Sequence, residues 1–318
     1  MKKELGILVI FICLCFTVAI GNPNFLSFTN LQNVGRLIGI FGIFSIGSGI
    51  VIITKGVDLS VGSLFALTGI IISQMLVEYN IFWVWAVLFT ILLSTALGFL
   101  HGFLITRFKI QPFIITLCGL LFYRGMARYI SNDVTLGFGY SKGFETLKFI
   151  STGNILGIPA PFILLVLIGG FFWLVLHKSV YGRYLFAVGR NEEASFFSGI
   201  NTNRIVLSAY VISGFLAGIC GILLAFYTNA VAPSAHGNFY ELYGIAAAVL
   251  GGCSLRGGEG SVIGIIIGAA MLQVIQNLVN LLGIPSSLNF PVMAVVILIG
   301  VFADRFFATR KKKQNLQI

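Results

Sequence analysis

Apolar runs long enough to cross a lipid bilayer recur from one end of this 318-residue sequence to the other. A spanning helix needs about 20 consecutive apolar residues, and it satisfies its backbone hydrogen bonds within its own segment. Because 58% of the residues are hydrophobic and only 9% are charged, the chain cannot be a series of soluble domains. The sequence therefore predicts an all-α, polytopic helical membrane protein with a single transmembrane domain, residues 1–318.

About ten transmembrane spans are predicted, with both termini on the cytoplasmic side. The expected spans cover residues 5–20, 31–54, 61–77, 81–105, 112–126, 161–176, 205–226, 241–252, 262–282 and 290–302. Residues 241–252 are too few to cross a bilayer alone at about 1.5 Å per residue, so a short or re-entrant segment is expected there. Because short segments of this kind are ambiguous, counts of eight or eleven spans stay open.

The distribution of charge predicts how the chain is oriented. The net charge of +10 comes from basic residues in short loops and in the C-terminal tail, which is the positive-inside pattern of a membrane protein. The expected partner of this charge is the bilayer, and no nucleic acid is expected. The pattern places the polar loop 177–204 in the cytoplasm and the polar segment 127–157 outside. A loop as long as 127–157 is usually functional in a compact protein.

Sequence motifs for covalent chemistry are missing. The chain has no G-x-x-x-x-G-K-[ST] phosphate-binding loop and no HExxH motif, and its cysteines form no CxxC pair. We therefore expect no metal and no other cofactor. The acidic residues map to span ends or loops, which argues against a proton- or sodium-driven carrier. His101 and Arg124 lie near predicted membrane edges, where extension to the headgroups is favoured over a role in transport.

The loop 177–204 contains a predicted helix of about two turns. Asn191 suits the N-cap position, and Glu192 and Glu193 follow in the first turn, where the helix dipole favours carboxylates. Gly199 suits the residue that ends such a helix. The loop therefore offers a capped helix to whatever binds the cytoplasmic face.

Three stretches of the sequence, in this order, resemble one known family. Residues 56–69 read GVDLSVGSLFALTG, residues 181–204 read YGRYLFAVGRNEEASFFSGINTNR, and residues 246–269 read AAAVLGGCSLRGGEGSVIGIIIGA. They are similar to the membrane permease of ribose-type monosaccharide ABC importers, and the resemblance covers nearly the whole chain. The wider superfamily includes branched-chain amino acid permeases, but the first two stretches look more like the sugar branch.

The resemblance implies a transport subunit that is not an enzyme. It implies a translocation path for a monosaccharide such as ribose in the bacterial cytoplasmic (inner) membrane, energised by separate ATPase subunits on the cytoplasmic side. A second permease copy and an extracytoplasmic sugar-binding protein are implied as further partners. The loop between the sixth and seventh spans is then the element that couples to the ATPase. The residues that match the family's coupling pattern are Asn191, Glu192, Glu193, Ala194, Ser198 and Gly199.

Several alternatives stay open at this point. The candidates for the translocation path or for gating are Asp58, Ser60, Gly62, Gly251 and Gly252. For the first three, helix capping and close packing are equally good explanations, with Asp58 accepting from backbone N–H groups near Ser60 and Val61. For the two later glycines, the alternative is a tight turn. The function alternatives are an ABC permease for another small polar solute (another sugar, an autoinducer-like furanose or an amino acid) and a stand-alone secondary carrier.

Overall fold

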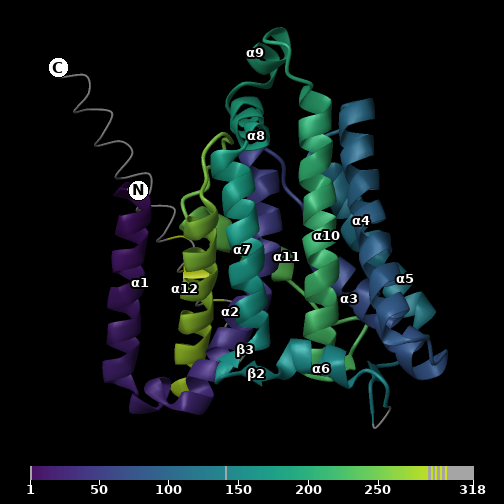
Figure 1. Ribbon diagram of the computed structural model, residues 1–318, viewed down its shortest axis with the longest axis vertical. Coiled ribbons are helices and arrows are strands. Elements are labelled where there is room, and N and C mark those ends of the chain that lie inside the picture. Colours follow the sequence, from purple (N-terminus) through teal and green to yellow (C-terminus); the bar gives the residue numbers. More distant parts are fainter. Residues whose placement is uncertain are drawn as a thin grey trace.

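Long helices run side by side between two ends of the molecule (Figure 1). The computed structural model describes residues 2–139 and 142–285, together with Leu288, Pro291, Ala294, Val295 and Leu298. In this part of the chain, eight helices are long and apolar enough to cross a membrane. They are α1 (Lys2–Gly21), α2 (Phe28–Ile53), α3 (Val61–Ser73) continued by the π-helical turn η2 (Gln74–Glu78), α4 (Trp83–Phe108), α5 (Pro112–Ile130), α7 (Ala160–Lys178), α10 (Thr202–Thr228) and α12 (Val262–Leu281).

A ninth apolar helix, α11 (Tyr240–Leu250), is too short to span. At about 1.5 Å per residue its length is about 16 Å, roughly half the thickness of the hydrocarbon core. The prediction of a short segment at this place is therefore confirmed. The first nine expected spans each correspond to one of these helices, whereas the expected span 290–302 lies largely outside the described residues.

The two ends of the molecule carry different short elements (Figure 1). One end, called the α9 end below, holds α8 (Val180–Arg190) and α9 (Glu192–Phe197). The other, called the α6 end, holds η1 (Pro23–Leu26), β1 (Leu136–Gly137), α6 (Glu145–Thr152), β2 (Asn154–Ile155), β3 (Ile158–Pro159) and β4 (Ala230–Val231). Strand β1 pairs antiparallel with β4, and β2 pairs antiparallel with β3.

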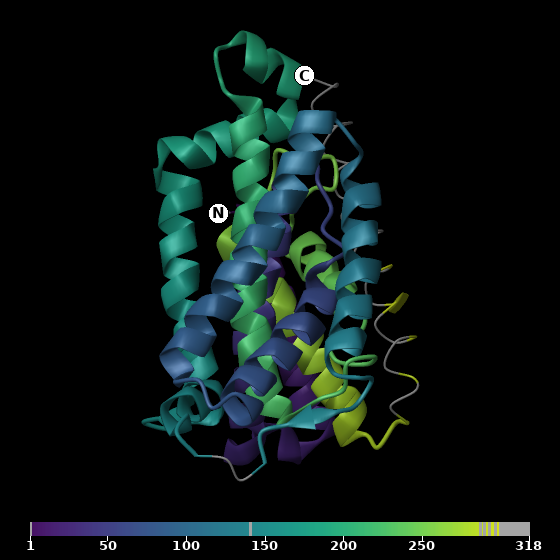
Figure 2. The ribbon, with the colours of Figure 1, turned by 90° about the vertical axis from the view of Figure 1, so that its right-hand side faces the viewer.

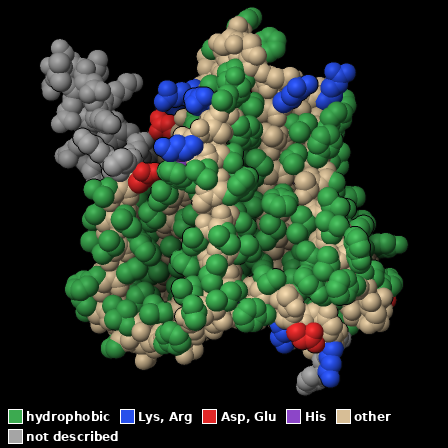
Figure 3. Space-filling view, viewed as in Figure 1, with side chains coloured by type: hydrophobic (Ala, Val, Ile, Leu, Met, Phe, Trp, Pro, Cys, Tyr) green, Lys and Arg blue, Asp and Glu red, His purple; other side chains and the backbone are tan. Residues whose placement is uncertain are grey.

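Charged residues gather at the two ends, and a broad hydrophobic surface separates them (Figure 3). The loop 177–204, which is predicted to be cytoplasmic, shares the α9 end with two other short basic loops. Lys109 forms an ion pair with Glu192 at 3.7 Å, and Lys55 Nζ donates to the Arg190 carbonyl at 3.2 Å. The segment 127–157, which is predicted to be external, meets the residues that follow α10 at the α6 end through the β1–β4 pair. The alternation of loops read from the charges is thus reproduced in three dimensions.

Helix α10 forms the centre of the bundle and packs against α4, α2 and α3. Small residues allow α4 and α10 to approach closely. A Cβ atom placed on Gly214 would lie 2.6 Å from the Ser94 carbonyl oxygen, which leaves no room for a larger residue. The Ser94 hydroxyl donates to the Gly214 carbonyl across the same contact at 2.6 Å. This packing holds the elements on which the candidate sites are built.

Candidate coupling and translocation sites

Helix α9 projects beyond the spanning helices at one end of the molecule, and α8 lies at the level of their ends (Figure 1, Figure 2). The sequence predicted one short helix here, and the structure contains two. Helix α8 begins after Ser179, whose hydroxyl accepts from the Gly182 N–H at 3.2 Å, and it buries Leu185 and Val188. The spacing of Gly182, Leu185 and Val188 is that of one helix face, so periodicity would have revealed α8.

Helix α9 has the predicted caps. The Asn191 side chain accepts from the Ala194 N–H at 3.0 Å, as an N-cap does. At the other end, Gly199 has a left-handed φ of 85°, and its N–H donates to the Phe196 carbonyl at 2.9 Å. The Ile200 N–H then returns to the Ser195 carbonyl at 3.1 Å, which closes the helix in the manner that glycine favours.

The tip of α9 is an exposed surface with both apolar and acidic side chains. The Phe196 and Phe197 side chains are 63% and 79% exposed. All six residues predicted to couple to the ATPase are exposed at this tip: Asn191, Glu192, Glu193, Ala194, Ser198 and Gly199. Phe196 and Phe197 are neighbouring aromatic residues, and both are exposed at the tip of α9. Exposed apolar side chains grouped in this way are typical of a surface that binds another protein.

The base of this projection is joined to the ends of other helices. The Gly258 N–H donates to the Ile53 carbonyl at 2.8 Å, which links the loop after α11 to the end of α2. Gly189 of α8 packs against both of these groups, and a Cβ atom there would overlap them. These contacts join α8 to the end of α2 and to the loop 251–260.

Gly251 and Gly252 lie in this same loop. Gly251 packs against the backbone of Gly264 in α12, so a Cβ atom would collide with it. Gly252 has a φ of 89°, which favours glycine. The tight-turn explanation accounts for both residues, and a place on the path stays a prediction for them.

The break between α2 and α3 is held by a buried carboxylate. Asp58 is only 3% exposed. Its Oδ1 atom accepts from the Ser60 N–H at 3.0 Å and from the Ser60 hydroxyl at 2.7 Å, and its Oδ2 atom accepts from the Ser213 hydroxyl at 2.8 Å. The predicted bond from the Ser60 N–H to Asp58 is present, but the N-cap of α3 is Ser60 and has no side-chain cap, so the prediction that Asp58 caps this helix is wrong. Asp58 instead holds the turn that precedes α3. The link to Ser213 on α10 could not be anticipated from local sequence.

Arg124 ties the first turn of α3 to the segment before α11. Its guanidinium donates to the carbonyls of Pro233 at 3.0 Å, His236 at 2.7 Å and Gly62 at 3.4 Å. Arg124 lies 12 residues after Pro112 and six before Ile130, so it is well inside the span. The expectation that Arg124 extends to the headgroups is therefore wrong, because backbone carbonyls inside the protein bind its charge.

Glu241 lies beside the same group and is only 7% exposed. A Cβ atom on Gly62 would overlap the Glu241 Oε2 atom and the Gly237 carbonyl oxygen. In the sequence Asp58 and Glu241 are at helix ends, but α3 and α11 are short, so these ends lie inside the protein. Ionisable groups are consequently present at depth, contrary to the expectation from sequence.

His101 is also buried and does not reach a membrane edge as expected. Its Nε2 atom is 2.7 Å from the Tyr123 hydroxyl, and its Nδ1 atom has no hydrogen-bond partner among the described residues. No local pattern in the sequence indicates this pair, because the two residues belong to different helices. His101 was therefore placed wrongly by the sequence analysis, and its partner Tyr123 was missed.

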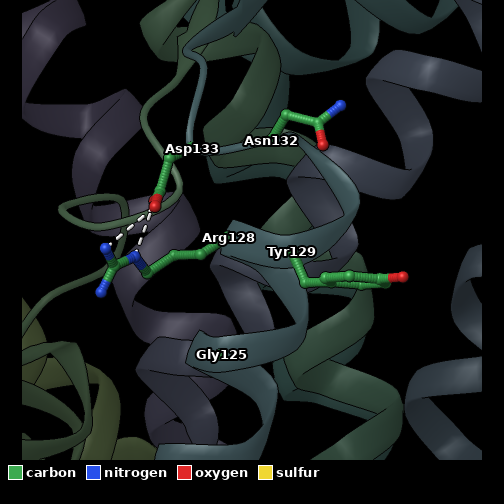
Figure 4. Close-up of a pocket in the computed structure, with 5 residues that line it drawn as sticks. All are labelled: Gly125, Arg128, Tyr129, Asn132 and Asp133. Carbon is green, nitrogen blue, oxygen red and sulfur yellow. Dashed lines mark hydrogen bonds and ion pairs between the residues drawn. The ribbon is translucent and has the colours of Figure 1, made fainter.

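The end of α5 that lies at the α6 end carries a surface hollow of about 300 Å³ (Figure 4). Its lining residues are Gly125, Arg128, Tyr129, Asn132 and Asp133. The Arg128 guanidinium donates to the Asp133 carboxylate at 2.6 and 2.9 Å, and this bond holds the pKa of Asp133 below its ordinary value. Tyr129 projects away from the pair (Figure 4). The hollow is a feature of the α6 end and contains no cluster that could hold a metal ion.

The helices of the bundle are long enough to span a membrane, and the break between α2 and α3 and the short helix α11 lie inside it. This arrangement defines a multi-pass membrane transport protein. Residues 30–302 match a family described as "Branched-chain amino acid transport system / permease component". The chain belongs to this family of ABC transporter permeases.

Named relatives cover the chain almost completely. It is 38% identical to the ribose import permease protein RbsC of Haemophilus influenzae, over 95% of this chain and 94% of the relative. Identity to RbsC of Bacillus subtilis is 37%, over 95% and 93%. Identity to the L-arabinose transport system permease protein AraH of Escherichia coli is 33%, over 97% and 92%. No solved structure matches the chain.

Family membership defines which subunit transports the substrate and which hydrolyses ATP. ABC permeases are transport subunits, and a separate subunit hydrolyses ATP, so this chain is not itself an enzyme. Importers of this class work in general with ATPase subunits and with a substrate-binding protein.

Proposed function

We propose that this chain is the permease subunit of an ATP-driven importer for a monosaccharide such as ribose, in the bacterial cytoplasmic membrane. The observation that carries the proposal is the 38% identity to a ribose import permease over nearly the full length of both chains. Relatives named for fructose and L-arabinose are 34% and 33% identical, which favours ribose over these sugars. The alternative is an ABC permease for another small polar solute.

The α9 end faces the cytoplasm in this proposal, and two copies of the chain surround the path. The sugar-binding protein then docks at the α6 end. The tip of α9 binds the ATPase, with Phe196 and Phe197 as apolar anchors and Glu192 and Glu193 as charges that favour a basic rim on the partner. The exposed faces of these four side chains support this assignment.

The contacts at the base of the projection supply a route for coupling. Closure of two ATPase subunits moves α9 and α8, and the bonds to Ile53 and from Lys55 pass this movement to the end of α2. The break held by Asp58 follows directly after α2, so the interrupted segment is the element that the movement biases. Transport proteins commonly place their substrate path at such interrupted helices.

The test is ATP-dependent uptake of labelled ribose and a panel of monosaccharides in proteoliposomes. The permease alone is compared with the permease plus ATPase and binding protein. Glu193→Ala combined with Gly199→Ala, in an assembled complex, is expected to abolish uptake. Uptake by the permease alone down an ion gradient would instead identify a secondary carrier. Uptake of an amino acid or a furanose signal in place of ribose would select the alternative permease.

A further inference from the structure

The segment that leads into α11 holds an aromatic residue in an unusual backbone conformation. Phe239 has a φ of 65°, in the left-handed region that bulky side chains rarely adopt. Its side chain is nevertheless 49% exposed, so burial of the ring does not explain the conformation. Strained residues of this kind persist where the surrounding structure fixes them, and they concentrate at functional sites.

The residues on both sides of Phe239 are fixed. Arg124 binds the carbonyls of Pro233 and His236, which precede it. Gly237 packs so tightly against Gly62 that a Cβ atom would overlap the Gly62 carbonyl. After Phe239, the Tyr240 ring lies among aromatic rings of α2, α3 and α11, with centroid distances of 4.8 to 6.4 Å to Phe41, Phe44, Phe65 and Tyr243.

Two side chains are presented outward from this fixed segment. Asn238 is exposed, and its Nδ2 atom donates to the Ser234 carbonyl at 3.0 Å, which orients the amide. The side chain of the next residue, Phe239, is about half exposed. The charged groups nearby are less exposed: Arg124 is half-buried and Glu241 is buried.

The depth of the pair decides what it faces. Arg124 lies six residues before the outer end of α5, so it is about 9 Å inside that end at 1.5 Å per residue. An amide at this depth is costly against lipid but is favourable where it lines a water-filled path. The location therefore favours the aqueous path over the bilayer as the surroundings of Asn238.

We propose that Asn238 and Phe239 form a sugar-contact station on the translocation path, held in place by Arg124 as a positioning residue. This inference rests on the proposed function. The face of an aromatic ring suits the C–H face of a monosaccharide, and an oriented amide suits its hydroxyl groups. The station contacts the sugar only in passing, because the binding protein sets the affinity of the importer.

The key variant removes the aromatic ring of Phe239 and at the same time relieves its backbone strain, so the two effects can be told apart. Phe239→Asn removes the ring, and asparagine tolerates a left-handed φ better than phenylalanine does. The variant is expected to keep or raise the melting temperature while it lowers the maximal uptake rate at saturating binding protein by about tenfold. Asn238→Ala is expected to lower the same rate, and Phe239→Tyr is expected to preserve it. Phe122→Ala, at an exposed ring of α5, is the matched control and should not change uptake.

The positioning role of Arg124 is tested separately, by comparing two variants of α5. Arg124→Gln is expected to lower uptake and to raise the ATP hydrolysed per sugar, while Leu121→Ala, at an exposed side chain one turn earlier on α5, leaves both unchanged. Wild-type importer that moves no monosaccharide refutes the proposed function. Wild-type importer that moves sugar, with normal rates in assembled Phe239→Asn and Asn238→Ala variants, overturns the station alone.

Discussion

The Ser213 hydroxyl donates a hydrogen bond of 2.8 Å to the Asp58 carboxylate, and this bond joins the middle of α10 to the break between α2 and α3. The two residues are 155 positions apart in the chain. Both are buried, so neither water nor lipid can replace the bond if one partner is lost. The bond therefore holds the interrupted segment in a defined place relative to the central helix.

Removal of this donor is expected to destabilise the protein. Ser213→Ala leaves the Asp58 Oδ2 atom buried without its donor, which costs about 1–3 kcal/mol. Ser45→Ala is the matched control, because the buried Ser45 hydroxyl bonds only to the Phe41 carbonyl within its own helix, at 2.6 Å. The measurement is the melting temperature in detergent. Equal melting temperatures for the two variants would show that the bond does not stabilise the fold.

A single methyl group at Gly62 is expected to disrupt the contact between α3 and α11. The added Cβ of Gly62→Ala would overlap the Glu241 carboxylate and the Gly237 carbonyl. The second of these is backbone and cannot rotate away, so we expect a loss of about 1–3 kcal/mol, as for an overpacked core. The melting temperature of the purified permease should fall accordingly.

The control for Gly62→Ala is a second glycine-to-alanine variant, for which the melting temperature is not expected to fall. Gly125→Ala in α5 meets nothing within 4 Å. Alanine favours a helix over glycine by up to about 1 kcal/mol, so this variant should melt at the same temperature or higher. A lower melting temperature for Gly125→Ala than for Gly62→Ala would contradict the assigned packing.

The sequence predicted well those features that depend on neighbours along the chain. The caps of α9 at Asn191 and Gly199 and the short segment at α11 all follow from local chemistry and length. It predicted poorly what depends on how short helices pack. Arg124 looked like a residue of a span edge because the expected span ended at residue 126, but α5 continues to Ile130. Glu241 looked like an edge residue because it begins a helix, but α11 starts inside the bundle, and only the fold brings both charges to Gly62. Helix α8 was missed although its apolar spacing was present in the sequence.

The exposed rings of α9 are expected to contribute most of the affinity for the ATPase. Phe196→Ala and Phe197→Ala should each weaken binding of the ATPase subunits by about tenfold or more, since exposed aromatic anchors often dominate an interface. Phe171→Ala on α7 is the control, because its ring is similarly exposed but lies on a spanning helix. Binding is measured by titration of labelled ATPase onto permease in nanodiscs. Unchanged affinity in both α9 variants would remove the tip from the interface.

Cys253 provides a chemical probe of the loop that joins α11 to α12. Its thiol is buried next to Gly260, and burial raises the pKa of Cys253 to about 12. Because the thiolate is the reactive form, only about one thiol in ten thousand is ionised at pH 8. A permease with Cys253 as its only cysteine should therefore react very slowly with a water-soluble maleimide. The rate should rise about tenfold per pH unit between pH 8 and pH 11, since the pKa lies above this range.

The control places a thiol two residues further along the same loop. Leu255 is exposed, so a Leu255→Cys, Cys253→Ser permease should react at the rate of an ordinary free thiol and approach a plateau near pH 9. Rapid labelling of Cys253 at pH 8 in the isolated permease would show that the loop 251–260 is open at rest. If movement of α8 and α9 is passed to this loop through Gly189 and Gly258, labelling of Cys253 should be slow in the isolated permease. It should become rapid only when ATPase subunits and ATP are added.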